Sequence, residues 1–181
     1  MKLEKAHFTE NLVRINALRF NKWVFEPGML FKSELKWWAD RGGRGEIHNG
    51  LDLLSYETDD GTVKKIGTDT KVPVIYEGRI VRRIKDFLGY TVFVAHDIYE
   101  GDSRLFTIYG HVLPIPEVPL GCTVEEGPII ATLSDAAETK VPVHLHLSVA
   151  LIPKDIPIES FSWKLLNETA NIHFFDPLHI I

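Results

Sequence analysis

Residues 141–150 read VPVHLHLSVA, and their alternation of polar and apolar side chains is typical of a β-strand. Successive side chains of a strand point to opposite faces, so His144 and His146 share one face while Leu145 points to the other. Two imidazoles side by side each need a polar partner if they are buried. A metal ion would supply one, and a solvated strand face is the alternative.

Short runs of β-branched and aromatic residues precede this strand, and glycine-containing turns such as Asp59-Asp60-Gly61 separate them. We expect strands at residues 72–77, 79–84, 91–96 and 105–112, with two more within residues 121–131. Such closely spaced short strands predict an antiparallel β-sandwich or β-roll rather than alternating strands and helices. After the last strand, a short helix is expected within residues 161–169.

The segment before this sheet is less regular. It carries several aromatic residues and ends in Arg41-Gly-Gly-Arg-Gly45, which we interpret as a loop. We therefore divide the chain into an N-terminal extension, residues 1–45, and a main domain, residues 46–181. The expected fold class is mainly β, with an irregular N-terminal extension and a short C-terminal helical insert.

Composition excludes several classes of protein. A formal net charge of -5 argues against nucleic acid or an anionic membrane as the main partner. Cys122 is the only cysteine, so neither an intrachain disulfide nor a thiolate zinc cluster is possible. Charges scattered through residues 1–20 do not form a signal peptide, and no later run is long enough for membrane insertion. Read literally, the chain is cytoplasmic, and its oligomeric state is left open.

A second histidine element reads His48-Asn49-Gly50-Leu51-Asp52. Asn-Gly favours a turn rather than a helix, and the turn would bring His48 and Asp52 together. Imidazole and carboxylate both suit zinc. The alternative is a turn in which the aspartate caps a nearby backbone amide.

A third element, Phe106-Thr-Ile-Tyr-Gly-His111, ends an alternating strand, and Gly110 permits close backbone approach beside His111. Taken in order, His48-x-x-x-Asp52, Tyr109-Gly-His111 and His144-Leu-His146 resemble the lysostaphin-type, LytM-like zinc endopeptidases. The hairpins around Gly78 and Gly127 and the closing Asp176-Pro177 are also similar to those of this family. The resemblance covers residues 47–178 and implies the duplicated hybrid motif β-roll.

The resemblance implies that one zinc ion per chain is bound by His48, Asp52 and His146. His111 and His144 would then be the unliganded catalytic pair, with His144 as general base and His111 stabilising the oxyanion. Two imidazoles and one carboxylate leave a fourth position open for water, as in catalytic zinc sites. The implied reaction is hydrolysis of peptide bonds, with peptidoglycan cross-link peptides as substrate; the substrate-binding residues are not identified.

The chain departs from the family at two places. Family members often have a glycine- and serine-rich loop before His-x-His, whereas Ser134 to Pro142 is more acidic and bulkier. Family members are also usually exported. Two alternatives to an active peptidase follow: a catalytically silent binding or regulatory module, and a histidine phosphocarrier of similar fold, although the motif set suits zinc better than phosphate.

Other candidate residues carry less weight. Trp37 and Trp38 could stack on a sugar but are more typical of a core or lid contact. Arg41 and Arg44 could contact a substrate carboxylate, although a solvated loop is the commoner outcome. The remaining histidines lack partners at ligand-like spacing and are expected to be structural or exposed: His7, His96, His173 and His179.

Overall fold

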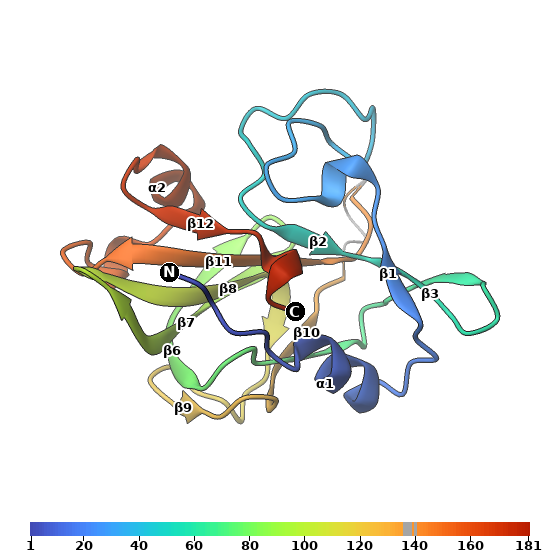
Figure 1. Cartoon of the computed structure of the whole chain (residues 1–181), viewed down its shortest axis with the longest axis horizontal. Coiled ribbons are helices and arrows are strands. Elements are labelled where there is room, and N and C mark those ends of the chain that lie inside the picture. Colours follow the sequence, from blue (N-terminus) through green and yellow to red (C-terminus); the bar gives the residue numbers. More distant parts are fainter. Residues whose placement is uncertain (136–138, 140) are drawn as a thin grey trace.

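The computed structural model describes residues 1–135, 139 and 141–181 (Figure 1). The loop from Ser134 to Pro142, in which the sequence departs from the family, therefore lies partly outside the described residues. The helices and strands are α1 (Phe8–Ile15), β1 (Lys22–Val24), β2 (Leu51–Leu53), β3 (Ser55–Glu57), β4 (Val63–Lys65), β5 (Lys71–Pro73), β6 (Gly78–Asp86), β7 (Gly89–Glu100), β8 (Ser103–Pro114), β9 (Thr123–Val124), β10 (Ile129–Leu133), β11 (Leu145–Pro153), α2 (Trp163–Glu168) and β12 (His173–Phe175), with short 3-10 turns at Pro27–Met29, Ile158–Ser160 and Pro177–His179.

Among the described residues, the strands form two sheets. The larger, with nine strands in that part of the chain, has the order β12-β11-β8-β7-β6-β9, with β10 paired to both β5 and β8, and with β2 paired to β11. The smaller has the order β1-β3-β4. All the strand pairs found in the described part of the chain are antiparallel, which confirms the mainly β, antiparallel class expected from the sequence.

Strand β8 separates two hydrophobic cores because its side chains alternate between its faces. Leu105 and Tyr109 point into the larger core, whereas Phe106 and Ile108 point into a second cluster. Phe161 and neighbouring residues of the C-terminal segment cover this second cluster. The C-terminal insert therefore seals one face of the sheet, and α2 lies above β11 in Figure 1.

Two expected strands differ from the sequence pattern at one end. The strand expected at residues 141–150 begins only at Leu145, so His144 precedes β11. Residues 72–77 were expected to be extended, but β5 ends at Pro73, which has no backbone N–H to donate to a ladder. The amide of Ile75 donates instead to the hydroxyl of the buried Tyr109, at 2.8 Å. The helix expected within residues 161–169 is present as α2.

The N-terminal segment packs closely against the main sheet. Phe8 and Leu12 of α1 are fully buried in the larger core, and β1 pairs with β3. The division of the chain at residue 45 remains a prediction.

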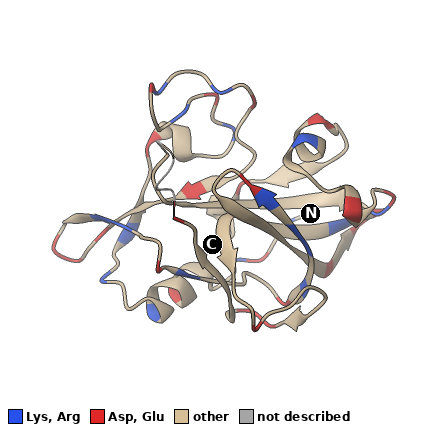
Figure 2. Ribbon diagram, turned by 180° about the vertical axis from the view of Figure 1, so that it is seen from behind, with Lys and Arg blue, Asp and Glu red and all other residues tan. Residues whose placement is uncertain are grey.

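Charged residues of both signs are interspersed along the chain (Figure 2). Within the described residues, no helix has the length and apolar character needed to cross a membrane.

Candidate metal centre

The candidate site lies where β2 pairs with β11 in the larger sheet. Asp52 of β2 is directly opposite His146 of β11, and His48 reaches them from the loop before β2. Gly50 makes this approach possible: a Cβ atom there would lie 2.6 Å from the Leu147 carbonyl oxygen and 2.7 Å from Nε2 of His146. The turn expected at Asn-Gly therefore brings the two halves of the motif together.

Three side-chain atoms converge at this point. Oδ1 of Asp52 lies 3.0 Å from Nε2 of His48 and 2.8 Å from Nδ1 of His146. The two nitrogens are 3.1 Å apart. All three residues are buried. In a tetrahedral site with ligands ~2.0–2.2 Å from zinc, the ligand atoms lie only slightly farther from one another than these three atoms do.

The far nitrogen of His48 determines which of its ring atoms faces the centre. Nδ1 lies 2.9 Å from the carbonyl oxygen of Leu30, which can only accept a hydrogen bond. Nδ1 therefore carries a proton, so Nε2 is the atom that the metal-binding form of this ring presents to Asp52. A backbone carbonyl behind a histidine is the usual way in which a metal-binding ring is oriented.

His146 is oriented in the opposite sense. Its Nε2 lies 2.9 Å from the Ser148 hydroxyl oxygen, and that hydroxyl donates to Asn49 at 3.4 Å. Ser148 can therefore accept from Nε2–H, which leaves the lone pair of Nδ1 facing Asp52. Two nitrogen lone pairs and a carboxylate oxygen then face one another within 3.1 Å. A cation between them removes the resulting repulsion, and this N₂O donor set suits zinc.

The other carboxylate oxygen of Asp52 is held from behind. The indole N–H of Trp37 donates to Oδ2 at 2.7 Å, and the Arg44 guanidinium lies 3.3 Å from it. Arg44 also donates to the Gly28 carbonyl at 2.7 Å and stacks on Trp38. The expectation that Arg44 belongs to a solvated loop is wrong, because its guanidinium is drawn to a buried carboxylate. Trp37 is a core contact, as expected.

Burial and charge set the protonation of these groups. Burial by itself raises the pKa of the Asp52 carboxyl, but the positive charge that His144 and His48 carry when protonated, together with the contacts of His146 and His48, outweighs burial and holds that pKa well below its usual range. Burial lowers the pKa of both His144 and His146 to about 4. The carboxylate is therefore ionised and these two rings are neutral at pH 7, the forms that bind metals.

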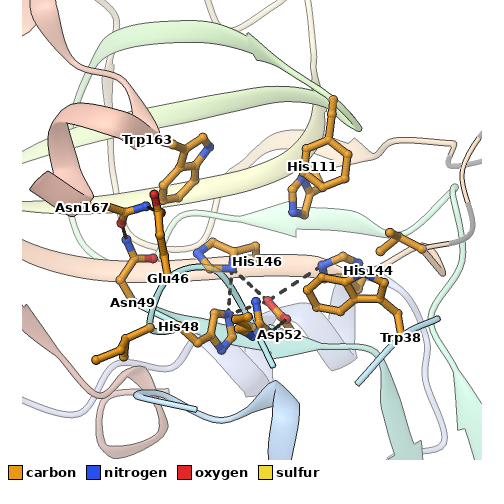
Figure 3. A pocket seen from close by; sticks show the side chains of 14 residues that line it. Trp38, Glu46, His48, Asn49, Asp52, His111, His144, His146, Trp163 and Asn167 are labelled. Carbon is orange, nitrogen blue, oxygen red and sulfur yellow. Dashed lines mark hydrogen bonds and ion pairs between the residues drawn. The ribbon is translucent and has the colours of Figure 1, made fainter. Parts of the chain in front are cut away.

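The remaining two histidines lie beside the three converging atoms. Nδ1 of His144 lies 2.8 Å from the Pro142 carbonyl oxygen, so it carries the proton and Nε2 is the basic atom. That Nε2 lies 3.8 Å from Oδ1 of Asp52. The ring of His111 lies 4.7 Å from that of His144, centroid to centroid. The structure thus brings together all five histidine and aspartate residues singled out in the sequence (Figure 3).

A cavity of about 260 Å³ opens over these residues, and aromatic side chains form much of its wall. Trp163 of α2 packs edge-on against His146 at 5.0 Å, and Phe87 packs against His111 at 5.1 Å. Trp38 and Asn167 also line it. The C-terminal insert therefore contributes directly to the wall of the site.

Sequence reasoning missed several of these residues. Trp163 and Phe87 carry no local signal, since apolar aromatic residues look alike whether they line a core or a cavity. Asp86, whose carboxylate contacts His111, could have been noticed as a carboxylate two residues before the Leu88-Gly89 turn. Such a residue is more often a turn cap, which Asp86 also is, since it accepts from the amide of Leu88 at 2.8 Å.

The comparisons with known proteins agree with this architecture. No protein-family model matches the sequence, and no curated protein does. Among solved structures, the catalytic domain of the antimicrobial peptidase lysostaphin from Staphylococcus simulans is similar, with a TM-score of 0.53 and 17% identity, over 96% of each chain. LytU is similar with a TM-score of 0.50 and 16% identity, over 87% of this chain and 82% of the LytU chain. The chain has the lysostaphin-type peptidase fold.

The lysostaphin-type fold confirms the architecture that the motif resemblance implied. Because the match with the lysostaphin catalytic domain covers 96% of this chain, it includes most of the N-terminal segment that supplies Trp37 and Arg44. At 17% identity, the two proteins share the course of the backbone but few of their side chains.

Proposed function

We propose that this chain is a zinc-dependent endopeptidase that binds one zinc ion and hydrolyses peptide bonds. The observation that carries the proposal is the convergence of three electron-rich atoms, from His48, Asp52 and His146, beside two further histidines at the base of a cavity. The lysostaphin-type fold supports it, since the similar domain from Staphylococcus simulans is an antimicrobial peptidase.

In this proposal the metal ion, His144 and His111 have separate roles. Zinc, when bound, supplies Lewis-acid polarisation and acidifies water at neutral pH. His144 offers Nε2 as the proton acceptor, because Pro142 holds the proton on its other nitrogen. His111, whose ring contacts that of His144, would stabilise negative charge on the carbonyl oxygen of the scissile bond.

The motif resemblance makes peptidoglycan cross-link peptides the first substrate class to test. The cavity walls of Trp38, Trp163 and Phe87 would exclude water from the bound peptide.

The test combines metal analysis with digestion of defined muropeptides. We expect one zinc per chain in the wild type, loss of zinc and activity in His48→Ala, and retained zinc without activity in His144→Ala. His7→Ala, which changes an exposed histidine paired with Glu126, serves as the control and should keep both. A protein that takes up no zinc, or a zinc-loaded protein inert on every cross-linked peptide, would overturn the proposal. In the second case a binding or regulatory module would be favoured.

A further inference from the structure

His111 has a carboxylate partner at the rim of the site. Asp86 is the last residue of β6, and its side chain is only 3% exposed. Nδ1 of His111 lies 3.4 Å from Oδ2 and 3.5 Å from Oδ1 of this carboxylate. The backbone amide of His111 also donates to Oδ2, at 3.3 Å.

The position of the Asp86 carboxylate does not depend on His111 alone. The amide of Leu88 donates to Oδ1 at 2.8 Å, and the Thr91 hydroxyl donates to Oδ2 at 2.7 Å. Burial raises the pKa of Asp86, but its hydrogen bond and charge interaction with His111 and its bonds with Thr91 and Leu88 outweigh burial and lower that pKa to about 2. The group is therefore ionised at neutral pH and can only accept hydrogen bonds.

His111 is constrained from its other sides as well. Its backbone φ is 65°, in the left-handed region that non-glycine residues rarely adopt. Such a conformation persists only where the surroundings enforce it, and the hydrogen bond from its amide to Asp86 does so here. Phe87 packs on the ring at 5.1 Å, so rotation of the imidazole is restricted.

We propose that Asp86 is a positioning residue that holds the proton on Nδ1 of His111 and thereby directs Nε2 of that ring into the site. An acceptor-only carboxylate beside Nδ1 requires a proton on that nitrogen in both forms of the ring. In the neutral ring Nε2 is then unprotonated, whereas in the doubly protonated ring Nε2–H is the group that can donate to an oxyanion. The significance for catalysis rests on the proposed function. The assignment of the proton does not.

The first experiment measures the tautomer directly in the wild-type protein. Long-range ¹H–¹⁵N NMR of the purified wild-type chain, recorded with and without added zinc at a pH where His111 is neutral, should show a protonated Nδ1 and an unprotonated Nε2. An Nε2–H tautomer overturns the proposal. This measurement needs no variant and no activity, so it decides the matter even if the wild type hydrolyses no peptide and the proposed function fails.

The second experiment uses Asp86→Asn, which places an amide NH₂ where the carboxylate accepts hydrogen bonds. Partners that orient metal-binding histidines typically contribute about 10–100-fold to activity, and we expect the partner of the unliganded His111 to matter to a similar degree. We expect kcat to fall by about that factor, with KM and zinc affinity unchanged, and the His111 tautomer to become mixed. Asp97→Asn is the matched control, because Asp97 of β7 is an exposed carboxylate that pairs with Arg104. An unchanged kcat in Asp86→Asn overturns the proposal, and a purely structural role would lower stability without changing the tautomer.

Discussion

Asp52 is the residue on which the candidate metal centre depends, because each of its oxygens has a separate set of contacts. Oδ1 faces the two histidine nitrogens, whereas Oδ2 accepts from Trp37 and lies beside Arg44. Donors on Oδ2 leave only Oδ1 for a metal, so the carboxylate is held for binding through one oxygen. Loss of a group that orients a metal ligand in this way typically costs about 10–100-fold in metal affinity.

Trp37→Phe tests this arrangement. The substitution keeps an aromatic ring but removes the N–H that donates to Oδ2 at 2.7 Å. We expect zinc affinity, measured by competition with a chelator, to fall by about 10–100-fold. Trp23→Phe is the control, since the indole of Trp23 donates to Thr9 instead. Equal zinc affinity in wild type and Trp37→Phe would show that the hydrogen bond does not orient Asp52.

At the scale of elements, the site depends on the close packing of the loop before β2 against β11. The side chains of β11 alternate, so Leu145 and Leu147 enter the larger core while His146 and Ser148 face the loop. Gly50 lies directly against this second face. The separation of loop and strand at this point therefore sets the distance between His48 and His146.

Gly50→Ala should disrupt the metal centre although it replaces none of the three proposed ligands. The added Cβ would lie 2.6 Å from both the Leu147 carbonyl oxygen and the Ser148 hydroxyl oxygen, so the loop must move away from β11. We expect zinc affinity to fall by at least about 10-fold in a chelator titration, because His48 moves with the loop. Gly67→Ala is the matched control, since a Cβ at Gly67 would meet nothing within 4 Å. Retention of full affinity by Gly50→Ala would contradict this account.

At the scale of the whole molecule, a buried polar chain crosses the larger sheet and contributes to stability. His96 lies 2.7 Å from the Glu77 carbonyl oxygen through Nδ1 and 2.9 Å from the Thr107 hydroxyl through Nε2. Thr107 in turn bonds to the hydroxyl of Tyr109, which receives the amide of Ile75. His96, Thr107 and Tyr109 therefore each have hydrogen-bond partners within the core.

The buried His96 makes the free energy of unfolding depend on pH. Burial lowers the pKa of His96 from 6.5 to about 4. The unfolded state therefore binds a proton more readily than the folded state. The contribution of His96 to the free energy of unfolding is complete above pH 6.5 and is lost as the pH falls from 6.5 towards 4. The loss amounts to about 2–3 kcal/mol at pH 4.5. Urea unfolding at pH 7 and pH 4.5 measures it.

The contribution of His96 is isolated by comparison with His96→Asn. The variant lacks the titrating group, so its loss of stability between the two pH values should be smaller by about 2–3 kcal/mol. His7→Ala, which changes an exposed histidine, should lose as much as the wild type. Equal pH dependence in all three proteins would show that His96 is not the group responsible.

Much of the fold could be predicted because its signals are local. Alternation along residues 105–112 and 141–150 predicted two central strands, β8 and β11, although β11 begins only at Leu145, and the turn glycines separated their neighbours. The strand predicted at residues 72–77 ends early, at Pro73, and the amide of Ile75 bonds to Tyr109, which is distant in sequence. A pattern of side chains does not reveal such a partner.

By itself, the sequence determined the antiparallel β class and the five residues of the candidate centre, since strand periodicity and the three histidine motifs are properties of short segments. Their catalytic and metal-binding roles remain predictions. Only the tertiary structure decided which residues support them: Trp37, Arg44, Asp86, Phe87 and Trp163. The physical reason is that orientation of a ring or carboxylate depends on the partner behind it. That partner often comes from a segment distant in the chain, brought close only when the cores on both faces of the sheet are packed.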